Sequence, residues 1–131
     1  MTRVFKARPI LDALTEAEQH QLVSDFKSYK EGELPELFGR DVLYDHPMNL
    51  AAIKDEEVRH LHLGNADAPW PIWKAQFNRT SDKHLVYCCG DTHPDRYLLM
   101  AILTPSAHDK AKDNNVMSRL GTMAEKFKEI H

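Results

Sequence analysis

The segment Tyr97-Leu-Leu-Met-Ala-Ile-Leu103 is apolar throughout, and it decides the predicted fold. A short run of this kind, rich in aliphatic residues, predicts a strand at the centre of a sheet that is buried on both faces. Thr104-Pro105 follows directly, and proline lacks the backbone donor that a central strand needs. We therefore expect the strand to end there. Its partner strands would come from segments elsewhere in the sequence.

Two further segments have the pattern of strands. Leu85 to Cys89 predicts a strand whose Leu85, Tyr87 and Cys89 face the core, and the turn Gly90–Asp95 follows it. Val58-Arg-His-Leu-His-Leu63 alternates, with Val58 and both histidines on one face. Shorter strands are predicted at Val4–Ala7 and, as one possibility, at Trp73–Arg79.

Helices are predicted before and after these strands in the sequence. Thr15 and Glu18 form a capping-box pattern at the start of a helix that Gly32 is placed to end. A short helix is expected over Pro35–Arg40, and 41–54 is expected to be irregular. A polar helix is expected near His108–Lys112.

The last helix has the clearest pattern, with Asn114 or Asn115 as its N-cap. One face of it carries a stripe of apolar residues at spacings of three and four: Val116, Leu120, Met123, Phe127 and Ile130. The elements together predict an α+β fold. It would have four or five mostly antiparallel strands, helices packed on one face and a C-terminal helix.

Composition suggests one domain over 1–131 in a reducing, cytoplasmic setting. The chain has 131 residues, 42% hydrophobic and 28% charged, and no apolar run long enough to cross a bilayer. Its two cysteines, Cys88 and Cys89, are neighbours whose side chains point to opposite faces of a strand, so they are not expected to pair. No glycine-rich nucleotide motif or cysteine-pair metal motif occurs, so no cofactor is expected.

Charge is unevenly distributed along the chain. Residues 1–67 carry 8 Lys and Arg against 13 Asp and Glu, a net −5, whereas residues 68–131 carry 9 against 7, a net +2. The cationic half is compatible with a phosphate ligand, and the total of −3 argues against a protein that coats nucleic acid non-specifically.

The segment Arg79-Thr-Ser-Asp-Lys-His-Leu-Val-Tyr-Cys-Cys89 lies in that half and suits chemistry on a phosphodiester. Metal-independent RNA cleavage needs a general base, a general acid and cations that stabilise charge on the phosphate. Histidine suits both proton transfers near neutral pH, and arginine suits the phosphate. We expect His84 and His108 to act in proton transfer. Arg79, with Lys110 or Lys112, would stabilise the phosphate, and Asp82 would orient an imidazole or bind a ribose hydroxyl.

The RNA-binding residues expected around this centre are His60, His62, Lys110 and Lys112. The strand alternation is expected to place His84 on an open sheet face, so that the site is a shallow groove. Two alternatives stay open: the His60–His62 pair also has the spacing of metal ligands, although no third ligand is evident, and each histidine could instead be a solvated surface residue.

Several strings, in fixed order over nearly the whole chain, resemble the YafO family of toxins from type II toxin–antitoxin modules. They include Leu34-Pro-Glu-Leu-Phe-Gly-Arg-Asp41, His60-Leu-His-Leu63, Phe77-Asn-Arg-Thr-Ser-Asp82, His84-Leu-Val-Tyr-Cys88 and Ala101-Ile-Leu-Thr-Pro105.

The resemblance implies an mRNA interferase that cleaves translated mRNA on the ribosome and is neutralised by a cognate antitoxin. It also implies a RelE-like, microbial-ribonuclease-like fold. The sequence departs from RelE-type toxins where His84 replaces the arginine before Leu-Val-Tyr and where His108 replaces a basic residue after the last strand. Alternatives are a translation-blocking, ribosome-binding protein without nuclease chemistry and a metal-dependent hydrolase using His60 and His62.

Overall fold

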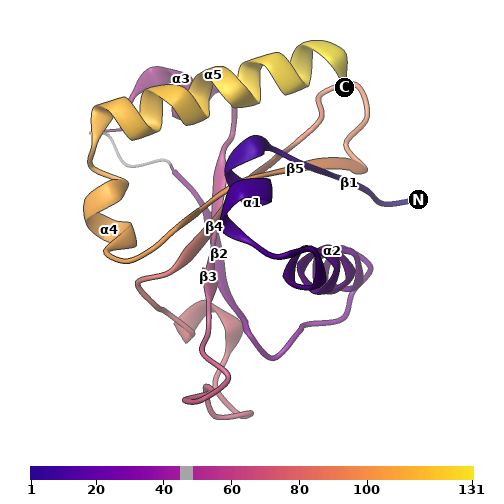
Figure 1. The fold of residues 1–131 in the computed structure, drawn as a ribbon, viewed down its shortest axis with the longest axis vertical. Coiled ribbons are helices and arrows are strands. Elements are labelled where there is room, and N and C mark those ends of the chain that lie inside the picture. The colour runs from indigo at the N-terminus through magenta and orange to yellow at the C-terminus, as the bar shows by residue number, and fades with distance from the viewer. Residues whose placement is uncertain (45–48) are drawn as a thin grey trace.

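The computed structural model describes residues 1–44 and 49–131 and contains one five-stranded sheet in the order β1-β5-β4-β3-β2 (Figure 1). The pairings β5–β4, β4–β3 and β3–β2 are antiparallel, while β1 runs parallel to β5. The sheet is therefore mixed. The strands are β1 (Arg3–Lys6), β2 (Phe38–Leu43), β3 (Arg59–Leu63), β4 (His84–Cys89) and β5 (Arg96–Leu103).

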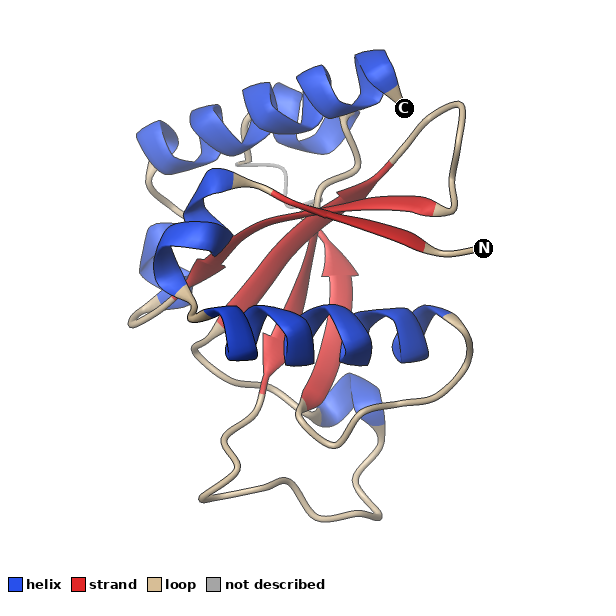
Figure 2. Ribbon diagram, turned by 45° about the vertical axis from the view of Figure 1, so that its right-hand side comes forward, coloured by secondary structure: helices blue, strands red, loops and turns tan. Residues whose placement is uncertain are grey.

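Helices cover both faces of this sheet, as Figures 1 and 2 show. The prediction that they pack on one face was wrong. The long helix α2 crosses one face and α5 crosses the other. The helices are α1 (Arg8–Ala13), α2 (Glu16–Lys30), α3 (Ala51–Asp55), α4 (Ala107–Lys110) and α5 (Asn114–Ile130), with a 3₁₀ turn η1 (Gln76–Asn78).

Two hydrophobic cores result, one on each side of the sheet. The α2 core gathers Phe26 and alternate strand residues such as Leu61, Leu85 and Tyr87. The α5 core contains Val58, Val86, Cys88 and residues of α3 and α5. Alternation within β3 and β4 explains the division, since successive side chains point to opposite faces. The α+β class and the face assignments of Leu61, Leu85 and Tyr87 are confirmed.

Strand β5 is buried along most of its length, which confirms the central strand expected from its apolar run. The capping box at α2 is also confirmed: the backbone N–H of Glu18 donates to Thr15 Oγ1 at 3.2 Å, and the N–H of Thr15 donates to Glu18 Oε1 at 2.9 Å. Helix α5 differs slightly from expectation, because Asp113 is its N-cap and Ile130 is 75% exposed.

The predicted helix over Pro35–Arg40 was wrong, because strand β2 begins at Phe38. The side chain of Phe38 is buried against Tyr29 of α2, and the gain from that burial outweighs a weak local preference for helix. Gly39 allows a close approach, since a Cβ there would collide with the carbonyl oxygen of Arg79. That carbonyl accepts a hydrogen bond from the N–H of Arg40 at 2.8 Å.

Two other expectations were also wrong. Trp73–Arg79 is not a strand: it contains η1, and Trp73 is 81% exposed, so no core packing favours an extended sheet strand there. The region expected to be irregular contains the end of β2 and the short helix α3, and its residues 45–48 lie outside the described part of the chain. Among the described residues, no helix is long and apolar enough to cross a membrane.

Candidate active site

Histidines from three separate segments meet on the α5 side of the sheet. The ring centroids of His60 and His84 are 5.0 Å apart, and those of His84 and His108 are 5.0 Å apart. Tyr44 extends the series, since its ring stacks on His60 at 4.1 Å with an interplanar angle of 16°. We call this series, Tyr44–His60–His84–His108, the ring row. The ring of His62 lies beside it, 4.2 Å from that of His84.

Strand pairing explains this convergence. His62 on β3 pairs with His84 on β4, and Val42 on β2 pairs with His60. Residues paired across an antiparallel ladder share a face, so these imidazoles point to the same side. His108 follows β5 in α4, whose start brings it over the same edge of the sheet.

The main chain of Ser81 holds two of the imidazoles. Its N–H donates to Nδ1 of His62 at 2.8 Å, and its carbonyl oxygen lies 3.0 Å from Nε2 of His84. A carbonyl can only accept, so Nε2 of His84 carries a proton. Nδ1 of His62 must instead be unprotonated, because it accepts a hydrogen bond. Both tautomers are thus fixed by one residue in the turn before β4.

Burial favours the neutral form of these imidazoles. Desolvation is the first cause that lowers the pKa of His60 to about 3 and that of His62 to about 4, and the neighbouring His84 lowers both further. Desolvation also lowers the pKa of His84. At neutral pH the three side chains are therefore uncharged proton acceptors rather than cations.

His84 is 1% exposed and His62 is 3% exposed, so the expected open groove was wrong. The face that carries them is covered by α5, α3 and α4 instead of facing solvent. His108 is the accessible member of the ring row, with its side chain 64% exposed.

Asp82 positions His108. Its carboxylate oxygen Oδ1 accepts from the backbone N–H of His108 at 3.1 Å, and its main-chain oxygen accepts from the N–H of Ala107 at 3.2 Å. The same Oδ1 lies 4.0 Å from Nε2 of the imidazole. The carboxylate therefore orders the first turn of α4 and lies close enough to bias the orientation of the ring.

A cavity of about 870 Å³ opens beside the ring row. We call it the histidine cavity; the lining residues used below are Tyr44, His60, His84, His108, Lys112 and Asn114. Three atoms of these residues, Tyr44 Oη, His60 Nδ1 and His84 Nδ1, are buried and have no hydrogen-bond partner among the described residues. Within those residues, no group of three or more His, Cys, Asp or Glu side chains is arranged to hold a metal ion.

Of the three cations expected at the phosphate, Arg79, Lys110 and Lys112, one lines the histidine cavity. Arg79 is 8% exposed, and its guanidinium donates to the carbonyl oxygens of Lys74 at 2.9 Å and Ile72 at 3.3 Å. It therefore orders the loop before β4 and is not among the residues that line the histidine cavity. Lys110 donates to the carbonyl oxygen of Thr104 at 2.7 Å, whereas Lys112 lines the cavity.

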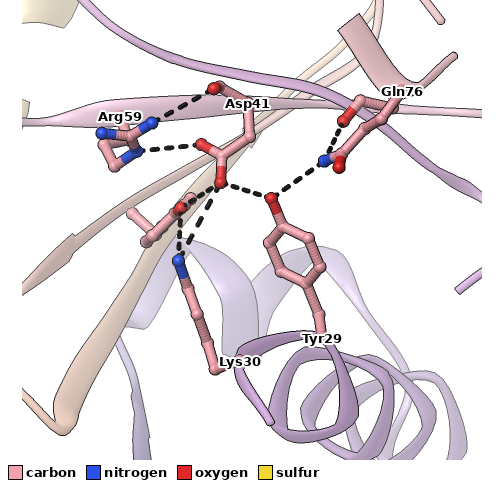
Figure 3. A network of polar contacts seen from close by, with 7 residues as sticks. Tyr29, Lys30, Asp41, Arg59 and Gln76 are labelled. Atoms are coloured by element: carbon pink, nitrogen blue, oxygen red, sulfur yellow. Dashed lines mark hydrogen bonds and ion pairs between the residues drawn. The ribbon is translucent and has the colours of Figure 1, made fainter. Parts of the chain in front are cut away.

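A second polar cluster lies on the α2 side of the sheet (Figure 3). The carboxylate of Asp41 accepts from the hydroxyls of Tyr29 at 2.7 Å and Tyr87 at 2.5 Å, and from Nε of Arg59 at 3.0 Å. Nζ of Lys30 donates to the Tyr87 hydroxyl at 2.9 Å. Burial, followed by the nearby carboxylate, raises the pKa of Tyr87. The cluster joins α2, β2, β3 and β4, which is a structural role.

Sequence reasoning missed Tyr44 and the main chain of Ser81. Tyr44 comes two positions after Val42, so strand alternation would have placed both on one face had β2 been recognised. No signal in the sequence identifies the role of Ser81, since it depends on backbone groups that every residue in that turn possesses.

Comparison with known proteins matches this chain to a family. The model of the family described as "Toxin YafO, type II toxin-antitoxin system" matches residues 26–129. The curated "mRNA interferase toxin YafO" of Escherichia coli (strain K12) is 48% identical over 128 residues, which is 96% of this chain and 97% of that protein. No solved structure matches the chain. The matched residues span all the segments that form the ring row, and the chain belongs to the YafO family of toxins from type II toxin–antitoxin systems.

Proposed function

We propose that this protein is an mRNA interferase, the toxin of a toxin–antitoxin module, which cleaves translated mRNA by metal-independent acid–base catalysis. Its relative in Escherichia coli is named an mRNA interferase toxin. The observation that carries the mechanism is the convergence of His60, His62, His84 and His108 beside one cavity.

The geometry supports a division of roles between His84 and His108. His84 is neutral and Nδ1 is its unpartnered acceptor, which suits the removal of a proton from a ribose 2′-hydroxyl. His108 is in contact with solvent and can deliver a proton to the leaving 5′-oxygen. Lys112, the cation that lines the cavity, would stabilise charge on the phosphate, and Asp82 would position His108.

The remaining expected residues take supporting roles in this proposal. The half-buried His60 and the buried His62 lie beside His84, and Lys110 holds the segment before α4. Arg79 acts through the loop that it orders, not on the phosphate. A RelE-like fold is also part of the proposal, and it is supported by the run of antiparallel strands β2 to β5 and the C-terminal helix.

Alanine and glutamine variants test the catalytic assignment. In a translation reaction with purified ribosomes, mapped breaks in a reporter mRNA should fall by at least about a hundredfold for His108→Ala and His84→Gln, the usual scale of a lost proton-transfer group. His20→Ala, an exposed histidine on α2, is the matched control and should cleave normally. Unchanged cleavage in both site variants would overturn the mechanism. Growth arrest by the wild type without mRNA breaks would favour a translation-blocking protein.

The charge of the chain supports ribosome dependence as part of the proposal. A net charge of −3 gives little general attraction to RNA, so the ribosome would have to present the message. Free reporter mRNA should therefore be cleaved far more slowly than the same mRNA under translation. Equal rates on free and translated mRNA would contradict the ribosome-dependent part of the proposal, while leaving nuclease activity intact. The proposed partners are thus mRNA, the ribosome and a cognate antitoxin, in the cytoplasm.

A further inference from the structure

The buried end of the histidine cavity carries polar atoms that lack partners. Tyr44 is 5% exposed and His84 is 1% exposed, yet Tyr44 Oη and His84 Nδ1 have no hydrogen-bond partner among the described residues. His60 Nδ1 shares this condition. Leaving such atoms unpaired in a protein is unfavourable, and it is rare for several to occur together. Because all three residues line one cavity, the atoms mark a place for a ligand.

The chemistry of these atoms defines the ligand. His60 is neutral, because burial lowers its pKa to about 3, so its unpartnered Nδ1 can form one hydrogen bond with a ligand. His84 Nδ1 is kept for the proton transfer proposed above. The hydroxyl of Tyr44 stays protonated, since burial raises its pKa, and so it can donate. A ligand that fits must present an acceptor to the Tyr44 hydroxyl and a second polar atom to His60 Nδ1. The edges of nucleobases have this character.

The ring row also determines where such a group would lie relative to the cleaved phosphodiester bond. Consecutive ring centroids from Tyr44 to His60, His84 and His108 are 4.1, 5.0 and 5.0 Å apart. The unpartnered atoms belong to the Tyr44, His60 and His84 part of the row, and the exposed imidazole of His108 is its other end. A base held near Tyr44 would therefore belong to a nucleotide next to a phosphodiester at His108.

We infer that the histidine cavity receives an unstacked base of the mRNA next to the cleaved bond, and that Tyr44 and His60 select that base by hydrogen bonds. This inference rests on the proposed function, because it takes RNA as the substrate. A volume of about 870 Å³ accommodates a nucleotide with its sugar and phosphate. Lys112 and Asn114, which line the same cavity, would contact the attached backbone. Sequence-specific readers of single-stranded RNA commonly bind splayed bases in this manner.

Tyr44→Phe is the sharpest variant, since it removes one hydroxyl and keeps the stack on His60. Mapped breaks on translated mRNA should still occur, but the preference for the favoured base beside the cut should fall about five- to tenfold, as expected for one hydrogen bond. Tyr97→Phe, the same change on β5, is the matched control and should keep the wild-type preference, because the Tyr97 ring packs in the α2 core. An unchanged base preference in Tyr44→Phe would overturn the inference.

A binding measurement separates this inference from the proposed function. Trinucleotides with 2′-deoxyribose cannot be cleaved, and a set that varies one base can be titrated into the purified protein while the imidazole NMR signals are followed. We expect the His60 and His84 signals to shift with one base preferred, and that preference to weaken in Tyr44→Phe. Absence of any shift, together with cleavage that depends on His108, would overturn the base pocket and leave the nuclease. Base-selective shifts with no cleavage by the wild type would support the pocket and refute the proposed function.

Discussion

The backbone N–H of Ser81 donates a hydrogen bond to Nδ1 of His62 at 2.8 Å. Through its carbonyl oxygen the same residue faces Nε2 of His84 at 3.0 Å. One residue of the turn before β4 therefore fixes the tautomers of two adjacent imidazoles, because its N–H can only donate and its C=O can only accept.

The tautomers can be measured directly. At pH 7 we expect His62 and His84 both to be neutral with the proton on Nε2, since burial lowers the pKa of each. Imidazole ¹⁵N chemical shifts distinguish the two tautomers and the charged form. A protonated Nδ1 on His62 would be incompatible with the hydrogen bond from Ser81.

Acid should weaken the fold through these buried histidines. The pKa of His60 is lowered to about 3 and that of His62 to about 4, below the value near 6.5 expected in the unfolded chain. Between the folded-state pKa and the unfolded-state pKa of each histidine, the unfolded state therefore binds more protons. The contribution of each histidine to stability is thus complete above about pH 6.5. It is lost as the pH falls toward the folded-state pKa.

The slope of this loss is at most about 1.4 kcal/mol per pH unit for each histidine. Urea unfolding from pH 7 to pH 5 should show a shallower decline in the double variant His60→Gln/His62→Gln than in the wild type. His20→Gln, which alters an exposed histidine, should keep the wild-type slope. Equal slopes in all three proteins would show that the cluster is not protonated on unfolding.

Asp41→Asn should destabilise the fold without acting on the site. The side chain of Asp41 is 7% exposed and accepts from two tyrosine hydroxyls and Arg59 on the α2 side of the sheet. Loss of its charge leaves Arg59 and Lys30 without their anionic partner, and we expect the free energy of unfolding in urea to fall by about 2–4 kcal/mol.

The matched control is Asp25→Asn, at a half-buried carboxylate that accepts only from Gln21 among the described residues, and its effect should stay within about 0.5 kcal/mol. At a temperature where both variants are folded, mRNA cleavage should match the wild type. A folded Asp41→Asn protein that cannot cleave would assign this cluster a part in catalysis.

Arg79→Met should loosen the loop before β4. The variant loses the hydrogen bonds from the buried guanidinium to the carbonyl oxygens of Lys74 and Ile72. We expect a loss of about 1–3 kcal/mol of stability and faster limited proteolysis within 72–79. Arg119→Met, at an exposed arginine on α5, should change neither. If cleavage were abolished while proteolysis and stability stayed unaltered, the role expected from the sequence, stabilisation of the phosphate by Arg79, would be supported instead.

Much of the architecture could be read from local patterns. The apolar run of β5, the alternation of Val58–Leu63 and the stripe on α5 each predicted an element that the structure contains. The prediction failed where tertiary contacts decide the conformation. Phe38 forms a strand because its ring packs against α2, and Trp73 stays in a loop because nothing covers it.

The sequence by itself determined which residues share a face, because alternation along a strand is a local property. It placed His60 and His62 together and His84 apart from Leu85 and Tyr87. Only the tertiary structure decided that these faces meet, since register between β3 and β4 and the position of α4 depend on contacts far apart in the chain. The tertiary structure also covers with helices the sheet face that was expected to be open. Burial there keeps the imidazoles neutral.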